Sequence, residues 1–349
     1  IVFTAYYSLT FGKTDFSDPN WSFASRFNFL ELFYKFLPSS YDTVRPAGLP
    51  FVYCGVLSLL MVPMFFFNKK FRTGEKVAYA VLITIFVFSF ATSSIDLIWH
   101  GFQKPNWLNY RYSFMLCFFL VSLAYRGLGE IRRTSARTIG MLGGLMLLFL
   151  ATAQKFNYHA VVERISGKVE FDQPLKDLEM IWLSGFCVIM VAIILCVMIR
   201  TRKRQTAALM LLVFVCIEAL GSCIVNCVEF GNDVIYSSYS SYNDFVGSLR
   251  PLTDEIVESD NSFFRYEKNV HRKYCDNMAL NIRGLTNSTS TLNKKTIDFL
   301  ANLGYASKSH WSKYLGGNLI NDSLLGIKYI IDTEDSDISN YYELTDFEE

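Results

Sequence analysis

The sequence carries almost no net charge and few charged residues. Its 349 residues include 33 basic and 32 acidic side chains, which leave a formal net charge of +1. No segment gathers the excess of basic residues that a nucleic-acid surface requires, so we expect no nucleic-acid partner. Charged residues make up 19% of the chain, whereas a soluble domain carries about 25%. The shortage is uneven and divides the chain into an apolar part and a polar part.

Cysteine pairs of the kind that bind metals are also missing. No Cys-x-x-Cys sequence occurs, and seven of the eight cysteines lie in or beside apolar stretches. Cys223 and Cys227 are spaced for one helix face, but no histidine lies near them. We therefore expect these thiols to pack as small apolar side chains. The sequence predicts no metal site, supports no divalent metal and shows no evident cofactor.

Complete catalytic motifs are absent. The sequence has no Gly-x-Ser-x-Gly, no His-Glu-x-x-His, no phosphate-cradling glycine loop and no evident pair of catalytic carboxylates. The chain also begins at Ile1 inside an apolar run, without an initiator Met or a basic n-region. This start does not fit a signal peptide, so we expect further sequence before Ile1.

Long apolar runs are what the sequence does have. Hydrophobic residues make up 51% of it, and a membrane-spanning helix needs about 20 mostly apolar residues. The run 81–90 lacks the polar stripe that a soluble helix would show. We expect a polytopic α-helical membrane bundle. The six predicted spans lie near 49–67, 77–95, 110–126, 138–154, 179–199 and 206–227.

The charges of the short loops predict an orientation. The loops 68–76, 126–137 and 200–204 are basic and fall on the same side of the predicted bundle. Basic loops stay in the cytoplasm. We therefore expect residues 1–48, the end of an upstream span plus a loop, and residues 228–349 to lie outside the cytoplasmic membrane.

Residues 228–349 form a different, polar part of the chain. Strand-like runs occur at 263–267 and 327–331, and 295–303 is typical of a helix with Asn293 or Thr296 as its N-cap. We predict an extracytoplasmic mixed α/β domain after the transmembrane region 49–227. Its acidic end gives no sign of a domain boundary, so further sequence is expected there too.

Two predicted outer segments carry polar residues beside the membrane. Asp96, His100, Asn106 and Arg111 lie in the connection between the second and third spans. An arginine can hold a lipid phosphate with two hydrogen bonds, and a histidine can bond or protonate it. The alternative is an aromatic belt with an arginine that extends to the interface.

The segment before the first complete span offers Asp42 and Arg45, which could contact a substrate or simply pair with each other. Glu218 lies inside the last span, where a carboxylate is costly unless it faces the bundle interior. It could act in the function or bond a neighbouring helix. In the polar domain, aromatic rings and amides suit sugar binding or an ordinary surface. They are Tyr266, Asn277, Asn281, Asn287, Asn293, Trp311, Tyr314 and Asn318.

Short sequence pieces along the chain match a known family in register. The first four are Phe-Leu-Pro-Ser-Ser-Tyr-Asp at 36–42, Gly-Leu-Pro-Phe-Val-Tyr-Cys-Gly at 48–55, Ile-Trp-His-Gly-Phe at 98–102 and Pro-Asn-Trp-Leu-Asn-Tyr-Arg-Tyr-Ser-Phe at 105–114. The others are Phe-Arg-Tyr-Glu-Lys at 264–268, Ser-Thr-Leu-Asn at 290–293 and Asp-Ser-Leu-Leu-Gly-Ile-Lys-Tyr-Ile at 322–330. Over nearly its whole length the chain resembles the YfhO family of bacterial membrane proteins.

The resemblance implies a glycosyltransferase of the GT-C type in the bacterial cytoplasmic membrane. Such an enzyme takes a sugar from a polyprenyl-phosphate carrier, such as undecaprenyl phosphate, on the outer face. It transfers the sugar to a cell-envelope glycopolymer such as lipoteichoic acid. The carboxylate that deprotonates the acceptor is expected upstream of Ile1. The match is looser at Asn106-Trp107, where the family has Asn-Gly, and at 281–288.

We therefore assign expected roles to particular residues. Arg111, His100 and Arg45 are candidates for the donor phosphate, and Asp42 and Asp96 are fallback carboxylates. Candidates for the acceptor sugar are Asn106, Tyr266, Asn293 and Trp311. Two other functions stay open: a transporter or flippase of lipid-linked sugars, which would need a continuous polar path, and a non-catalytic envelope assembly protein.

Overall fold

The computed structural model describes residues 6, 21–27, 29, 31–102, 104–105, 107–153, 174–201, 204–234, 236–289, 292–308 and 310–332. They fall into two compact units. The helical unit comprises residues 20–100 and 105–235, and the C-terminal unit is formed mainly by residues from Tyr236 onward.

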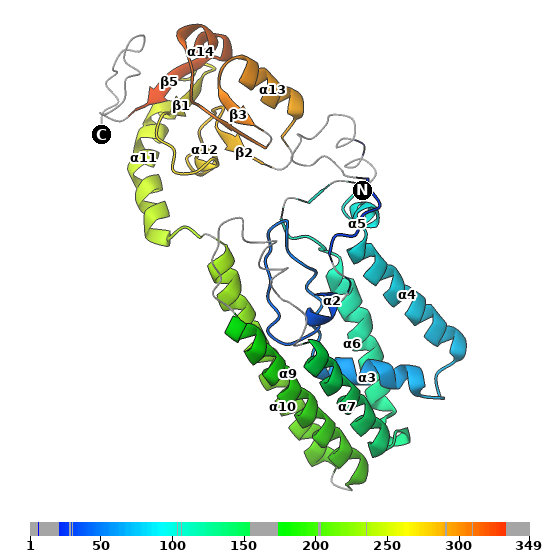
Figure 1. The fold of residues 1–349 in the computed structure, drawn as a ribbon. Helices are drawn as coiled ribbons and strands as arrows, with labels where there is room; N and C mark the ends of the chain where they lie inside the picture. Colours follow the sequence, from blue (N-terminus) through cyan, green and yellow to red (C-terminus); the bar gives the residue numbers. More distant parts are fainter. Residues whose placement is uncertain are drawn as a thin grey trace. The chain divides into compact units, whose positions relative to one another are not determined.

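Helices account for most of the helical unit (Figure 1). Three of them are long and apolar enough to cross a membrane: Thr73–Ala91, Met180–Arg200 and Gln205–Asp233. Three shorter apolar helices occupy the other predicted spans, so the number six stays a prediction. The elements are α2 (Glu31–Tyr34), α3 (Val56–Phe67), α4 (Thr73–Ala91), α5 (Ser93–Trp99), α6 (Ser113–Gly129), the 3-10 turn η2 (Ile131–Arg133), α7 (Ala136–Ala153), α9 (Pro174–Arg200) and α10 (Arg204–Asp233).

Helix α9 begins at Pro174 and α10 ends at Asp233, beyond the predicted limits 179 and 227, while two other predicted spans are shorter at one end. The stretch 49–55 is extended, and α3 begins only after Gly55, whose φ of 90° suits glycine. Helix α4 begins at Thr73 and ends at Ala91 rather than at 95, because Thr92 is extended and pairs with Ser25. Both shortened ends arise where the backbone leaves the helical conformation beside another part of the chain.

Close packing of helices forms the core of the helical unit. Helix α3 lies against α6, and a Cβ at Gly127 would come within 2.7 Å of the Met61 carbonyl oxygen, so only glycine fits there. Helix α9 packs between α7 and α10 and buries Val191 and Leu195. Apolar side chains nevertheless remain exposed on α10, such as Ile217, which is 63% exposed. Exposed apolar helix surface of this kind is typical of contact with lipid.

The C-terminal unit combines helices with two small sheets (Figure 1). Strands β1 and β5 pair in parallel, and β2, β4 and β3 form an antiparallel sheet in that order. The predicted α/β character is therefore present, while the side of the membrane stays a prediction. The elements are α11 (Tyr239–Ser259), β1 (Arg265–Lys268), α12 (Asp276–Ala279), β2 (Asn287–Ser288), α13 (Lys294–Asn302), β3 (Ala306–Lys308), β4 (Trp311–Lys313), α14 (Leu319–Leu325) and β5 (Ile327–Ile331).

A buried carboxylate organises the middle of the C-terminal unit. Glu267 in β1 is 0% exposed and accepts hydrogen bonds from the backbone N–H of Thr286 at 2.7 Å and the Asn277 amide at 3.0 Å. The N–H of Leu285 donates to the same oxygen. A Cβ at Gly284 would lie 2.2 Å from this oxygen. The loop around Gly284 therefore closes over Glu267 only because it carries a glycine.

Candidate functional site

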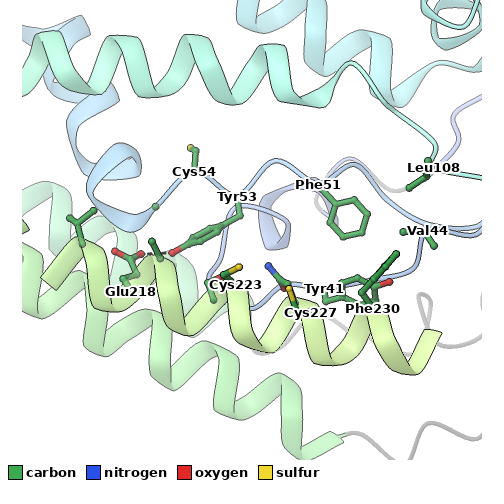
Figure 2. Close-up of a pocket in the computed structure, with 15 residues that line it drawn as sticks. Tyr41, Val44, Phe51, Tyr53, Cys54, Leu108, Glu218, Cys223, Cys227 and Phe230 are labelled. Carbon is green, nitrogen blue, oxygen red and sulfur yellow. Dashed lines mark hydrogen bonds between the residues drawn. The ribbon is translucent and has the colours of Figure 1, made fainter. Parts of the chain in front are cut away.

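The helical unit contains a pocket of about 650 Å³. This volume is within the range of about 300–1,000 Å³ that is typical of ligand sites. Most of its lining is apolar, with polar groups near both ends (Figure 2). The lining residues are Tyr41, Val44, Phe51, Tyr53, Cys54, Gly55, Leu108, Val215, Glu218, Ala219, Ser222, Cys223, Asn226, Cys227 and Phe230.

Two segments far apart in the sequence form the long walls of the pocket. One wall is α10, whose lining side chains recur every three or four residues from Val215 to Phe230. This spacing places them on one face of the helix. The other wall is the extended stretch 51–55, from which Phe51 and Tyr53 face α10 (Figure 2). The extended stretch replaces the first turns of the predicted span, so the pocket exists where a helix was expected.

Glu218 marks one end of the pocket, and this carboxylate is 9% exposed. Its Oε1 accepts hydrogen bonds from the Tyr53 hydroxyl and, at 2.8 Å, from the backbone N–H of Val56. Val56 is the first residue of α3, so its N–H has no partner within that helix. Oε2 of Glu218 is buried without a hydrogen-bond partner. Glu218 thus bonds a neighbouring segment through one oxygen, and its other oxygen is enclosed without a partner.

Asp233, the last residue of α10, binds the loop at the other end. Its carboxylate accepts hydrogen bonds from Thr43 Oγ1 at 2.7 Å, the Tyr41 hydroxyl at 3.0 Å and the Val44 N–H at 3.1 Å. Its second oxygen accepts from Arg45 Nε at 3.0 Å. Arg45 therefore pairs with Asp233, and the alternative in which it pairs with Asp42 is wrong.

The two candidate arginines, Arg45 and Arg111, meet on one short segment. Arg111 donates from Nη2 to the Trp107 carbonyl and from Nε to the Leu108 carbonyl, both at 3.2 Å. The guanidinium carbon of Arg45 lies 5.8 Å from the centre of the Trp107 ring. The Leu108 N–H in turn donates to the Val44 carbonyl at 2.7 Å. The structure thus joins both predicted outer segments, and Val44 and Leu108 line the pocket between them.

Asp42 lies in the same loop, between pocket residues Tyr41 and Val44. Its Oδ2 accepts a hydrogen bond from the Leu49 N–H at 2.8 Å, and its Oδ1 is buried without a partner. Nearby, Lys35 is 4% exposed and donates to the Ser40 carbonyl. Asp42 thus holds the loop through one oxygen, and its second oxygen is enclosed.

Asp96 and His100 belong to a separate, enclosed cluster. Asp96 is 0% exposed, pairs with Arg26 and accepts a hydrogen bond from the Tyr112 hydroxyl at 2.9 Å. His100 Nε2 lies 3.5 Å from the Asp96 carboxylate. The Trp99 ring stacks on Tyr112 at 4.8 Å and helps to close the cluster. Asp96 is fully enclosed by protein, and His100 Nε2 is buried without a hydrogen-bond partner, so neither group presents an exposed atom to a donor phosphate or an acceptor hydroxyl.

The acceptor candidates lie in different environments. Tyr266 is 0% exposed, and its hydroxyl donates to the Asn281 carbonyl at 3.1 Å, so its ring has no face for a sugar. Asn293 caps α13 by accepting from the Lys295 N–H at 2.8 Å. Trp311 keeps partial exposure and stacks on Tyr274. Asn106 lies outside the described residues.

Several site residues were not singled out from the sequence. Asp233 has the clearest signal, since it is an acid at the end of the last long apolar helix. Tyr53 lies within one of the matched sequence pieces, but nothing local connects it with Glu218. Among the described residues, no group of three His, Cys, Asp or Glu side chains could hold a metal ion.

Comparison with known proteins gives one match. A family model described as bacterial membrane protein YfhO matches residues 1–349. No curated protein and no solved structure matches the chain.

Proposed function

Because the chain belongs to the YfhO family of bacterial membrane proteins, we propose that it acts as a membrane glycosyltransferase. In this proposal it moves a sugar from a polyprenyl-phosphate carrier to a cell-envelope glycopolymer, such as lipoteichoic acid, on the outer face of the cytoplasmic membrane. The observation that supports it most is the pocket of about 650 Å³, with apolar walls and two arginines near one end.

The pocket suits the isoprenoid part of the carrier. Its walls are mainly apolar side chains of α10 and of the stretch 51–55. Since a helix rises about 1.5 Å per residue, the face of α10 from Glu218 to Phe230 is about 18 Å long. A long, narrow apolar site buries a hydrocarbon chain, and each buried methylene contributes about 0.8 kcal/mol. The first isoprene units therefore lie between Phe230 and Glu218.

The donor phosphate lies beside Arg45 and Arg111. Each guanidinium has five N–H donors. Two on Arg45 bond Asp233, and two on Arg111 bond carbonyls, so both keep donors for a phosphate. Charge-assisted bonds from arginine to phosphate are among the strongest in proteins. The Asp233 pair also holds Arg45 in place before the substrate arrives.

The reaction itself is a single displacement at the sugar. The acceptor hydroxyl oxygen attacks the anomeric carbon, the bond from that carbon to the phosphate oxygen breaks, and polyprenyl phosphate leaves. The two arginines stabilise the negative charge that develops on the phosphate. A carboxylate takes the proton of the acceptor hydroxyl. Among the described carboxylates we assign this role to Asp42, which lies three residues from Arg45 in the same loop, whereas Glu218 lies at the end of the pocket away from Val44 and Leu108.

Complementation of a deletion strain tests this function. The full-length gene is deleted and restored as wild type, as Arg111→Ala or as the control Arg132→Ala, which removes an exposed arginine from η2. We expect deletion to remove one sugar from the purified envelope polymers. Wild type and Arg132→Ala restore it, while Arg111→Ala does not, although the protein stays in the membrane.

The two other functions give different results in the same experiment. A non-catalytic assembly protein would leave the sugar content unchanged on deletion, with no accumulation of lipid-linked sugar. A flippase would move the lipid-linked sugar without cleaving it, so membranes of the complemented strain would release no polyprenyl phosphate from the donor. Either result would overturn the transferase proposal.

A further inference from the structure

Five side chains of the C-terminal unit form what we name the basic aromatic face: Tyr274, Trp311, Lys273, Lys308 and Lys313. The rings of Tyr274 and Trp311 stack with centres 4.9 Å apart and planes inclined by 29°. Tyr274 is 43% exposed, and Lys273 and Lys308 are also exposed. None of these residues belongs to the pocket of the helical unit.

The sheet register places Lys308 and Lys313 beside Trp311. Lys308 in β3 is the partner of Trp311 in β4, and directly opposed residues in a sheet point to the same face. Lys313 follows Trp311 by two residues in β4, so it also lies on that face. On the other side of Trp311, the partner residue is Ser288 of β2. The indole is thus flanked by two lysines and a serine.

Within the described part of the chain, none of the lysines Lys273, Lys308 and Lys313 forms an ion pair. Lysine is a strongly hydrated point charge that binds phosphate well. The unpaired ammonium groups of Lys308 and Lys313 beside Trp311, with that of Lys273 next to Tyr274 in the sequence, therefore create a local positive potential. Such a potential attracts an anionic chain and increases its association rate.

The loop that carries Tyr274 is fixed by a buried polar network. Asp276 accepts hydrogen bonds from the N–H groups of Arg272 at 2.7 Å and Lys273 at 2.8 Å. Lys268, which is 1% exposed, donates from Nζ to Nδ1 of His271 at 2.9 Å. His271 Nε2 lies 3.2 Å from the carbonyl oxygen of Tyr314, the residue after β4.

This network joins the loop to the strand that carries Trp311. A lysine ammonium can only donate, so Nδ1 of His271 accepts and Nε2 carries the hydrogen that binds the Tyr314 carbonyl. The two backbone segments that carry the rings are therefore joined before any ligand binds. A preorganised binding face loses less side-chain entropy when it binds.

From this arrangement, and resting on the proposed function, we propose that the basic aromatic face binds the acceptor as an anionic glycopolymer. Sugar rings stack on the face of the Tyr274 ring that is turned away from Trp311, and the phosphates of the polymer backbone bind Lys273, Lys308 and Lys313. The face holds the polymer by several weak contacts along its length. It supplies acceptor at high local concentration without taking part in bond breaking.

A binding measurement tests this inference separately from catalysis. Full-length protein in detergent is titrated with purified, lipid-free poly(glycerol phosphate) carrying sugar substituents, and with neutral dextran as the comparison. We expect the charged polymer to bind at least about tenfold more tightly than dextran, with affinity that falls as salt rises. Trp311→Ala and the double variant Lys308→Ala/Lys313→Ala should each raise the Kd about tenfold, a loss of about 1.4 kcal/mol.

Matched variants control for folding and for general charge. Trp311→Phe retains an aromatic ring and should keep most of the binding. Lys295→Ala removes an exposed lysine from α13, and Tyr239→Ala removes an 87% exposed tyrosine from α11; neither should change the Kd. Equal binding of dextran and the charged polymer would overturn the inference. So would unchanged affinity in both the Trp311→Ala protein and the double lysine variant.

Failure here is distinguishable from failure of the proposed transferase. Release of free polyprenyl phosphate from the donor is measured in parallel with the same protein samples. Donor turnover without polymer binding would overturn the acceptor face and leave the transferase proposal in place. Polymer binding that depends on Trp311, without donor turnover, would support the face and contradict the transferase.

Discussion

The backbone N–H of Val56 donates to Oε1 of Glu218 over 2.8 Å, which joins the start of α3 to the middle of α10. The Tyr53 hydroxyl binds the same oxygen. Glu218 therefore fixes the extended wall of the pocket against its helical wall. In the transferase proposal, this contact sets the width of the site for the isoprenoid chain.

Two substitutions of Glu218 distinguish the contribution of its hydrogen bonds from the contribution of its charge. Glu218→Gln keeps an oxygen that can accept from Val56 and Tyr53, so we expect a folded protein with most of its transfer activity. Glu218→Leu leaves two donors without their acceptor and should lower stability by about 1–3 kcal/mol. Thermal unfolding in detergent and donor binding measure the two effects. Severe loss of activity with normal stability in Glu218→Gln would contradict a purely positioning role.

Asp42→Asn tests the proposed acceptor base. Asparagine can still accept the hydrogen bond from the Leu49 N–H, which keeps the loop in place. Removal of a general base typically lowers the rate about 10²–10⁴-fold, so we expect a loss of transfer in that range with unchanged donor binding. Asp244→Asn, at an exposed position of α11, is the control. Transfer at the wild-type rate in Asp42→Asn would rule out this residue as the base.

The stability of the C-terminal unit should fall as the pH is lowered from 6.5 to 4. Burial and the neighbouring Lys268 ammonium lower the pKa of His271 from 6.5 to about 4. Between these values the unfolded chain binds more protons than the folded one, so protonation favours unfolding. Above pH 6.5, His271 is neutral in both the folded and the unfolded chain, so it no longer makes the free energy of unfolding depend on pH.

Denaturant unfolding at several pH values, followed by tryptophan fluorescence, measures this dependence. The His271→Gln protein lacks the titrating ring. Between pH 6.5 and 4, its free energy of unfolding should therefore fall less steeply with decreasing pH than that of the wild type. Equal slopes in the two proteins would show that His271 is not held neutral by its surroundings.

Gly284→Ala should loosen the C-terminal unit. The added Cβ would lie 2.2 Å from Glu267 Oε1 and 2.6 Å from the Asn277 amide nitrogen, so the loop must move. Overpacking of this kind costs about 1–3 kcal/mol. Hydrogen exchange of the Leu285 and Thr286 amides should accelerate.

Gly247→Ala is the matched control, because nothing lies within 4 Å of a Cβ at this position of α11. Alanine is the better helix former by about 1 kcal/mol, so exchange there should be unchanged or slower. Equal effects of the two substitutions would contradict the close fit at Gly284.

Local sequence signals predict the elements of this fold well. Apolar runs mark the helices, and the choice between Asn293 and Thr296 as N-cap is settled in favour of Asn293. The predicted helix 295–303 forms as Lys294–Asn302. Its start can be predicted because an N-cap depends only on residues close by in the sequence. Such features need no information from distant parts of the chain.

Long-range pairing explains what the sequence does not reveal. Arg45 pairs with Asp233 across 188 positions, and nothing near either residue favours that partner over Asp42. Likewise, the helix expected to reach residue 95 ends at Ala91 because Thr92 pairs with Ser25. The pocket depends on these distant contacts, so its residues could be only partly anticipated.

Transfer from a defined donor tests the central claim most directly. Purified full-length protein in lipid bilayers is given a polyprenyl-phosphate-linked radiolabelled sugar and the envelope polymer as acceptor. We predict protein-dependent labelling of the polymer with release of polyprenyl phosphate in equal amount, lost in the Arg45→Ala/Arg111→Ala protein and kept in Arg132→Ala. Absence of labelling by a folded wild-type protein that binds both donor and polymer would contradict the account.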